Sequence, residues 1–242
     1  MAKSLRVTKP FHFKQFSLFH HNSTMKIGTD TILLSAWCDV DNTKKILDIG
    51  TGCGIIALLM ASRTDAIIDA IELDKNSVNE ASGNFINSKF ANRLNIIHDD
   101  FVNFANKTSH KYELIISNPP FFSNDLNSPT LSRNSARHIA NLNHNNLCIG
   151  VKKVLVSEGR FCLVMPYEIA NEFIVTAFNH GLHLHKKQLV NPKPGSKPNR
   201  INMEFRFGFP TDVLIDEITL RNDDNQHSSQ YKELVQEFLV SI

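Results

Sequence analysis

Short apolar segments, rich in β-branched residues, alternate with longer helical segments between Lys44 and Phe209. This alternation is typical of βαβ units, in which helices cover the faces of a parallel sheet. Seven strands are expected, at residues 46–49, 67–73, 94–98, 112–117, 160–165, 182–189 and 202–209. The sequence therefore predicts an α/β fold with a doubly wound, mostly parallel sheet.

The last two expected strands are separated only by "NPKPGSKPNR", residues 191–200. This connection has no room for a crossover helix, so the two strands should pair as an antiparallel hairpin. The clearest helices are expected at residues 76–88 and 142–156. A further helix near the end of the chain should pack one apolar face on the domain, formed by Tyr231, Leu234, Val235, Phe238 and Leu239.

The chain has 242 residues and a formal net charge of +2, which favours one domain and excludes a histone-like or acidic-tail protein. We expect an N-terminal extension at residues 1–36, before the sheet domain at residues 37–242. The 4 cysteines form no C-x-x-C pair and the N-terminus has no signal-peptide core, so a cytoplasmic protein is expected. No apolar run is long enough to span a membrane, and the histidines form no convincing metal set. The expected state is a monomer that binds no membrane, metal or DNA.

The stretch "ILDIGTGCGIIALLMA", residues 46–61, combines a strand, a tight glycine turn and the start of a helix. Gly50, Gly52 and Gly54 allow the backbone to turn sharply and to approach a ligand without a Cβ in the way. A dinucleotide-binding fold is the obvious alternative, but its G-x-G-x-x-G pattern would need glycine in place of Ile55. The G-x-G-x-G spacing therefore disfavours a pyrophosphate site.

Acidic residues follow at the ends of the next two strands. Glu72, in "AIELD", lies about 20 residues past the glycines, where a carboxylate accepts hydrogen bonds from ribose hydroxyls. Asp100, in "HDDF", is placed to reach an adenine amino group. The alternatives are that Asp100 caps the next helix and that Glu72 pairs with a lysine. Because ligands bind at the carboxyl edge of open α/β sheets, the pattern favours a nucleoside-containing ligand.

These features resemble the class I S-adenosylmethionine-dependent methyltransferases over residues 44–209. The resemblance implies a Rossmann-like, seven-stranded sheet with an antiparallel last strand, and S-adenosyl-L-methionine as the cofactor. In that family the glycines contact the methionine side of the cofactor, the first acidic residue its ribose and the second its adenine. The implied cofactor-binding residues are Asp48, Gly50, Gly52, Gly54, Glu72, Asp100 and Phe101.

The fourth expected strand ends in "SNPPFF", residues 117–122. An exocyclic amine on a purine is a poor nucleophile because its lone pair is delocalised into the ring. Two acceptors, the side-chain oxygen of Asn118 and the carbonyl of Pro119, would bind its two N–H groups and free that lone pair. Each proline holds the preceding residue extended, and Phe121 offers a face for base stacking. We expect Asn118, Pro119 and Phe121 to be catalytic; the alternative is that this segment only closes a core.

The tetrad resembles the [N/D]-P-P-[F/Y/W] signature of methyltransferases that act on planar nitrogen: adenine N6, guanine N2 or a glutamine side-chain amide. Two earlier pieces, "FKQF" at residues 13–16 and "MKIGTD" at residues 25–30, resemble the bacterial family that makes N6-methyladenosine beside the anticodon of a valine tRNA. Phe121 departs from that family, in which Tyr is frequent. The expected function is therefore methylation of adenine N6 in a tRNA anticodon loop.

Three alternatives stay open at this point. A ribosomal RNA guanine-N2 methyltransferase or a protein glutamine-N5 methyltransferase would use the same tetrad, although the latter should carry a larger helical recognition domain. A non-enzymatic RNA-binding module would not need Asn118 or Glu72.

An anticodon loop already holds unstacked purines, so presenting the target base costs less there than in a duplex. The N-terminal extension at residues 1–36 is expected to act as a lid or RNA contact. The residues expected to contact RNA are Lys14, Lys26, Arg133, Arg137, Lys193, Lys197 and Arg200. For the two arginines near residue 135, the alternative is a flexible surface loop without a ligand.

Overall fold

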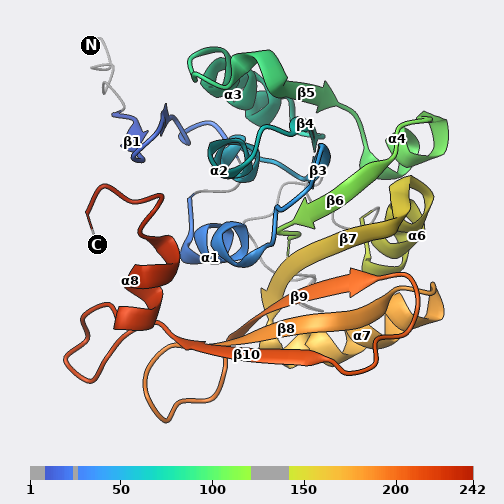
Figure 1. The fold of residues 1–242 in the computed structure, drawn as a ribbon. Helices are drawn as coiled ribbons and strands as arrows, with labels where there is room; N and C mark the ends of the chain where they lie inside the picture. Colours follow the sequence, from blue (N-terminus) through green and yellow to red (C-terminus); the bar gives the residue numbers. More distant parts are fainter. Residues whose placement is uncertain (1–8, 24–26, 121–141, 242) are drawn as a thin grey trace, which may run out of the picture.

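An eight-stranded sheet forms the centre of the computed structural model, which describes residues 9–23, 27–120 and 142–241 (Figure 1). The strands lie in the order β10, β8, β9, β7, β6, β3, β4, β5. Their bounds are β3 Lys45–Ile49, β4 Ile67–Glu72, β5 Leu94–His98, β6 Tyr112–Ser117, β7 Leu155–Pro166, β8 His183–Asn191, β9 Arg200–Arg206 and β10 Leu214–Thr219. The strands from β3 to β7 pair with one another in parallel, as the alternating pattern predicts.

The expected hairpin is confirmed, because β9 pairs antiparallel with β8 and also with β7. The expected number of strands is wrong by one, since β10 adds an edge strand parallel to β8. The first four residues of β10 are exposed. An exposed edge strand lacks the continuous apolar run that marks a buried strand in a sequence. In chain order, the antiparallel strand β9 is thus followed by one more strand of the sheet, β10, and is not the last strand.

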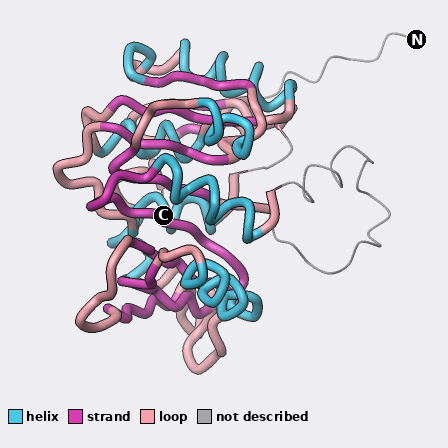
Figure 2. Tube along the Cα trace, turned by 90° about the vertical axis from the view of Figure 1, so that its right-hand side faces the viewer, coloured by secondary structure: helices cyan, strands magenta, loops and turns pink. Residues whose placement is uncertain are grey.

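Helices cover both faces of this sheet, as the view turned by 90° also shows (Figure 2). Their bounds are α1 Thr29–Trp37, α2 Ile55–Arg63, α3 Lys75–Ile86, α4 Phe101–Lys107, α6 His144–Val154, α7 Ala170–Asn179 and α8 Ser229–Val235, with 3-10 turns at Ala91–Arg93 and Tyr167–Ile169. The two helices expected most clearly are present as α3 and α6. No helix in the described part of the chain is long and apolar enough to cross a lipid bilayer.

Successive side chains of β6 point to opposite faces of the sheet and therefore belong to two different layers of the core. Leu114 and Ile116 belong to the layer that contains α1 and α2, whereas Ile115 belongs to the layer that contains α4, α6 and α7. All three side chains are fully buried. This pattern is that of a central parallel strand covered on both faces.

The N-terminal residues share the core of the sheet. β1 (Phe11–His12) and β2 (Ser17–Leu18) form a small antiparallel hairpin. Phe13, Phe16 and Leu18 are buried in the layer of α1 and α2. The extension expected from the sequence thus supplies apolar surface to the same layer as the sheet.

The C-terminal helix packs against this layer, as expected. Tyr231 and Val235 of α8 are buried, and so is Phe238, which follows the helix. The backbone N–H of Lys14 donates to the carbonyl of Phe238 at 2.8 Å. The two ends of the chain are therefore joined by backbone hydrogen bonding as well as by apolar contact.

Candidate active site

Several strand ends meet at one edge of the sheet. Ile49 of β3 lies beside Ile71 of β4 and Ser117 of β6. Glu72 of β4 lies beside His98 of β5. The glycine turn, Glu72 and the Asn-Pro-Pro segment therefore leave neighbouring strands at the same edge (Figure 1). This is the edge at which open α/β sheets bind ligands.

The glycine turn has three residues with positive φ: 70° at Gly50, 57° at Gly52 and 86° at Gly54. A Cβ on Gly50 would meet nothing within 4 Å, so the backbone there borders open space. A Cβ on Gly54 would lie 2.4 Å from the Cε1 atom of Phe85. Gly50 thus permits the approach of a ligand, whereas Gly54 also permits α3 to pack on the turn.

Asp48, at the end of β3, is fully buried inside the turn. Its Oδ2 atom accepts hydrogen bonds from the hydroxyl of Thr51 and from the backbone N–H of Ala57, the latter at 3.1 Å. Its Oδ1 atom has no hydrogen-bond partner among the described residues. Burial raises the pKa of Asp48 to about 7, although the two hydrogen bonds oppose the rise; the charge of Glu72 adds to it.

Asp48→Asn should therefore change how stability depends on pH. An aspartate whose pKa rises from 3.8 to about 7 on folding makes its full contribution to the free energy of unfolding only below pH 3.8. This contribution is lost as the pH rises through 7, and the loss is on the order of 4 kcal/mol. Urea unfolding between pH 4 and pH 8 should show the wild type losing stability relative to Asp48→Asn. A difference that stays constant over this range would contradict the prediction.

Glu72 connects the end of β4 to the glycine turn. Its Oε2 atom accepts a hydrogen bond from the backbone N–H of Gly52 at 2.9 Å. Its Oε1 atom accepts from the N–H groups of Leu73 and Asp74, both at 2.8 Å. The alternative role of Glu72, an ion pair with a lysine, is not found within the described ranges. The carboxylate is thus fixed by backbone donors at the place where a ribose is expected.

Asp100 caps α4, which was the alternative to an adenine contact: its Oδ1 atom accepts from the N–H of Asn103 at 3.1 Å. The ring of Phe101 is buried in the core, where a Cβ on Gly150 would lie 2.5 Å from it. Both residues nevertheless follow β5, next to Glu72. Their contact with the adenine of a cofactor stays a prediction.

Asn118 follows β6 and is only 7% exposed. Its Nδ2 atom donates a hydrogen bond to the hydroxyl oxygen of Thr31, in the first turn of α1, at 3.1 Å. Pro119 is also buried, and Phe121 lies outside the described residues. The contact with Thr31 was not expected. The available signal was the "MKIGTD" piece, which runs directly into this helix.

Two polar residues of α3 hold the N-terminal segment behind the glycine turn. Asn84 donates to the carbonyls of Phe19 and Cys53, both at 2.8 Å, and accepts from the N–H of Phe19. Glu80 accepts from the N–H groups of residues 21–23. Burial raises the pKa of Glu80, but these backbone donors lower it, and the pKa lies below its usual value. The i, i+4 spacing of two polar residues on a packed helix was the only sequence signal.

The cations expected to contact RNA lie in two places. Lys193 and Lys197 are exposed in the loop after β8. Because β9 is antiparallel to both β7 and β8, β8 runs parallel to β7 and this loop leaves the sheet at the carboxyl edge. Arg200, at the start of β9, pairs with Asp30 of α1 at 2.8 Å. Lys14 lies instead at the junction of the chain ends, where its Nζ atom donates to the carbonyl of Gln236 at 2.5 Å.

The remaining expected contacts, Lys26, Arg133 and Arg137, lie outside the described residues. Within the described ranges, no group of three or more His, Cys, Asp or Glu side chains is arranged to hold a metal ion. The site described so far therefore consists of the glycine turn, the acidic strand ends, Asn118 and the first turn of α1.

Comparison with known proteins places this chain in a family. Residues 17–180 match the family model described as Methyltransferase small domain. The chain is 37% identical over 232 residues to the tRNA1(Val) (adenine(37)-N6)-methyltransferase of Phocaeicola vulgatus, covering 96% of this chain and 98% of that one. It is 37% identical over 234 residues to the protein of the same name from Salmonella enteritidis, covering 95% and 94%.

Among solved structures, a predicted O-methyltransferase of Agrobacterium tumefaciens has the same fold, with a TM-score of 0.66 at 16% identity over 86% and 96% of the two chains. The fold class and the family resemblance expected from the sequence are both confirmed. The chain therefore belongs to the methyltransferase small-domain family and, within it, to the family of tRNA1(Val) (adenine(37)-N6)-methyltransferases.

Proposed function

We propose that this chain is an S-adenosylmethionine-dependent tRNA (adenine-N6)-methyltransferase that modifies the adenosine next to the anticodon of valine tRNA. One observation carries the proposal: Asn118 leaves the sheet directly beside the glycine turn, and Glu72 lies at the end of the strand on the other side of that turn. The names of the relatives favour adenine N6 over guanine N2 or a glutamine amide. A non-enzymatic RNA-binding module would have no use for this arrangement.

The residues at this edge fit S-adenosylmethionine. Gly50 borders open space, and Asp48 holds the glycine turn in shape by accepting hydrogen bonds from Thr51 and Ala57. Glu72 would hold the ribose hydroxyls and Asp100 the adenine amino group. When bound, the cofactor supplies a methyl group activated by a sulfonium centre.

The residues after β6 would prepare the amine. The Oδ1 atom of Asn118 and the carbonyl of Pro119 accept the two N–H groups of adenine N6, which turns the nitrogen lone pair out of the ring plane. Pro119 has no N–H that could compete for these acceptors. Holding the amine in line with its target lowers the barrier by proximity, which can supply on the order of 7–11 kcal/mol. A strong base is unnecessary, because the methylated nitrogen cation is very acidic.

The proposal is tested by incubating the purified protein with labelled S-adenosylmethionine and total tRNA from a strain that lacks this modification. The labelled nucleoside is then identified by mass spectrometry, and the labelled tRNA by hybridisation. N6-methyladenosine in valine tRNA is the expected product. Label on guanine, on protein or on another tRNA would contradict the proposal.

Lys193 and Lys197 should contribute to tRNA binding through phosphate contacts. Changing both to alanine is expected to reduce the magnitude of the slope of log Kd against log salt by roughly 1.4–1.8, since each phosphate contact contributes about 0.7–0.9. Filter binding between low and moderate salt measures this slope.

Lys107 and Lys152 provide the matched control for this pair. Both are exposed and lie in the last turns of α4 and α6, just before the amino ends of β6 and β7. Their double alanine variant removes the same charge from the opposite edge of the sheet and should keep the wild-type slope. Equal slopes in the two double variants would place the RNA elsewhere.

A further inference from the structure

The first turn of α1 supplies a buried contact to Asn118 that the sequence motifs do not name. Thr31 is 1% exposed and Asn118 is 7% exposed, and their side chains meet at 3.1 Å although they lie 87 positions apart. We infer that Thr31 is a positioning residue that fixes the orientation of the Asn118 amide. The inference rests on the proposed function, because it concerns the same site.

The orientation matters because an amide group has a donor side and an acceptor side. A threonine hydroxyl can donate or accept a hydrogen bond, and here the hydroxyl oxygen of Thr31 accepts from the Nδ2 atom of Asn118. When the Nδ2 atom of Asn118 donates to Thr31, the Oδ1 atom lies on the other side of the amide, where the proposed function places the substrate amine. A rotated amide would present N–H groups to the N–H groups of the substrate, and two donors do not bind each other.

The position of Thr31 is set from the N-terminal end of α1. Asp30, the preceding residue, pairs with Arg200 at 2.8 Å, and Arg200 lies opposite Pro166 in the pairing of β9 with β7. Both Asp30 and Arg200 are partly buried. The ion pair therefore connects the first turn of α1 to the two strands that lie beyond Asn118 in the sheet.

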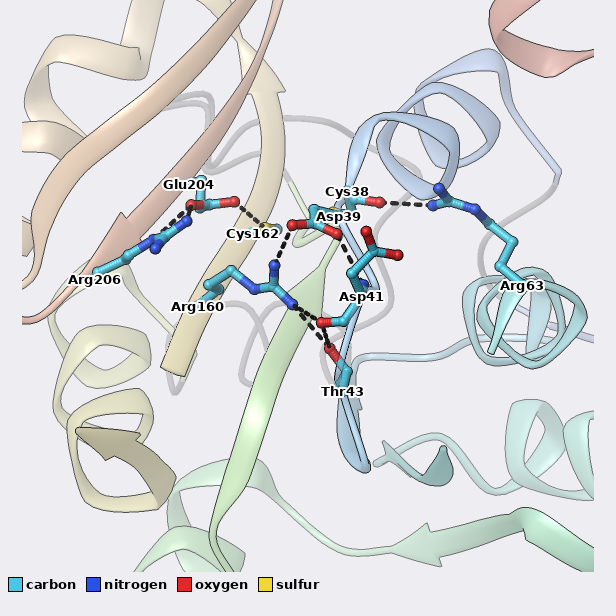
Figure 3. A network of polar contacts seen from close by, with 9 residues as sticks. All are labelled: Cys38, Asp39, Asp41, Thr43, Arg63, Arg160, Cys162, Glu204 and Arg206. Carbon is cyan, nitrogen blue, oxygen red and sulfur yellow. Dashed lines mark hydrogen bonds and ion pairs between the residues drawn. The ribbon is translucent and has the colours of Figure 1, made fainter. Parts of the chain in front are cut away.

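The C-terminal end of α1 is also held by arginines (Figure 3). Arg63 of α2 donates to the carbonyls of Ser35 and Cys38, both at 2.6 Å. Arg160 of β7 pairs with Asp39, just after the helix, at 2.6 Å. The last carbonyls of a helix have no partners within it, so Arg63 satisfies groups that the end of α1 leaves open, while Arg160 holds the residue that follows. Since α1 is anchored at both ends, Thr31 meets Asn118 in a defined position.

The test replaces Thr31 with valine, which keeps the branched shape and removes the acceptor. We expect kcat for adenine methylation to fall about 10- to 100-fold, as a misplaced catalytic group does, with little change in cofactor Kd or in KM for tRNA. Thr31→Ser restores the hydroxyl and should recover most of kcat. Thr29→Val makes the same change at an exposed residue of the same turn and should behave as the wild type.

A wild-type kcat in Thr31→Val would overturn the inference, and so would a kcat in Thr31→Ser as low as that in Thr31→Val. Thermal unfolding shows whether the variants are folded. If Thr31→Val is not, Thr31→Ala compared with Thr31→Ser gives the same test of the hydroxyl.

Failure of the proposed function would look different from failure of this inference. In the first case the wild type would label guanine N2 or a glutamine amide. The ratio of kcat between Thr31→Val and the wild type would then still decide the role of Thr31, because Asn118 would orient any of these planar amines. In the second case the wild type would methylate adenine and Thr31→Val would do so equally well.

Discussion

Asn118→Ala is expected to lower kcat by about 10²- to 10³-fold, the loss typical of removing a preorganised hydrogen-bonding group from a reacting centre. The side-chain oxygen is one of the two proposed acceptors for the N–H groups of adenine. With Pro119 alone, the amine keeps its conjugation with the ring and its lone pair stays out of line. Single-turnover methylation of tRNA measures the loss directly.

The affinity for the cofactor should change little in Asn118→Ala, because the glycine turn and Glu72 are untouched. Isothermal titration with S-adenosylmethionine checks this point. Asn118→Asp is the matched control: it keeps acceptor oxygens but cannot donate to Thr31 as the amide does. It should retain part of the activity that the alanine variant loses. A parallel loss of cofactor affinity in Asn118→Ala would move Asn118 out of its assigned role.

The central strands could be predicted because each of them is buried on both faces. A continuous apolar run such as Leu114 to Ile116 then marks the strand without help from its neighbours. β10 could not be found in this way, since Leu214 and Ile215 are each 64% exposed and acidic residues follow them. Its place in the sheet depends on pairing with β8, and this pairing between separate segments cannot be read from the local sequence.

The motif residues of the site could likewise be predicted, because each stands in a local pattern at a strand end. Glu72 follows the glycines at a fixed distance along the chain, and Asn118 is followed by two prolines. Thr31 and Glu80 have no such pattern. Their roles come from partners in distant segments, Asn118 for Thr31 and the backbone of residues 21–23 for Glu80.

Arg200 also shows that the sequence does not reveal the partners of a residue in distant segments. The contact of Arg200 with RNA stays a prediction, and nothing in the sequence indicates that it pairs with Asp30, which lies 170 positions earlier in the chain. Charge along a sequence indicates neither the partner nor the exposure of an arginine. By contrast, Lys193 and Lys197 stand in a short turn rich in proline, where exposure follows from the local sequence, and both are exposed.

Glu72→Ala is expected to weaken cofactor binding by about 10²- to 10⁴-fold, since hydrogen bonds to a charged group contribute about 1.5–3 kcal/mol each and two ribose hydroxyls would lose theirs. The same change leaves the N–H groups of Gly52, Leu73 and Asp74 without their acceptor. The glycine turn would therefore loosen in the free protein as well. Equilibrium dialysis with labelled S-adenosylmethionine gives the Kd.

Glu72→Gln separates the two effects. Its single side-chain oxygen can still accept from part of this backbone set, whereas the amide nitrogen has no lone pair to offer Gly52 or a ribose hydroxyl. Its Kd should therefore lie between those of the wild type and Glu72→Ala. Binding of tRNA without cofactor should be unchanged in both variants, because the lysines after β8 are far along the sheet from β4. An unchanged cofactor Kd in Glu72→Ala would mean that the ribose lies elsewhere, and the order of binding sites along this sheet edge would have to be drawn again.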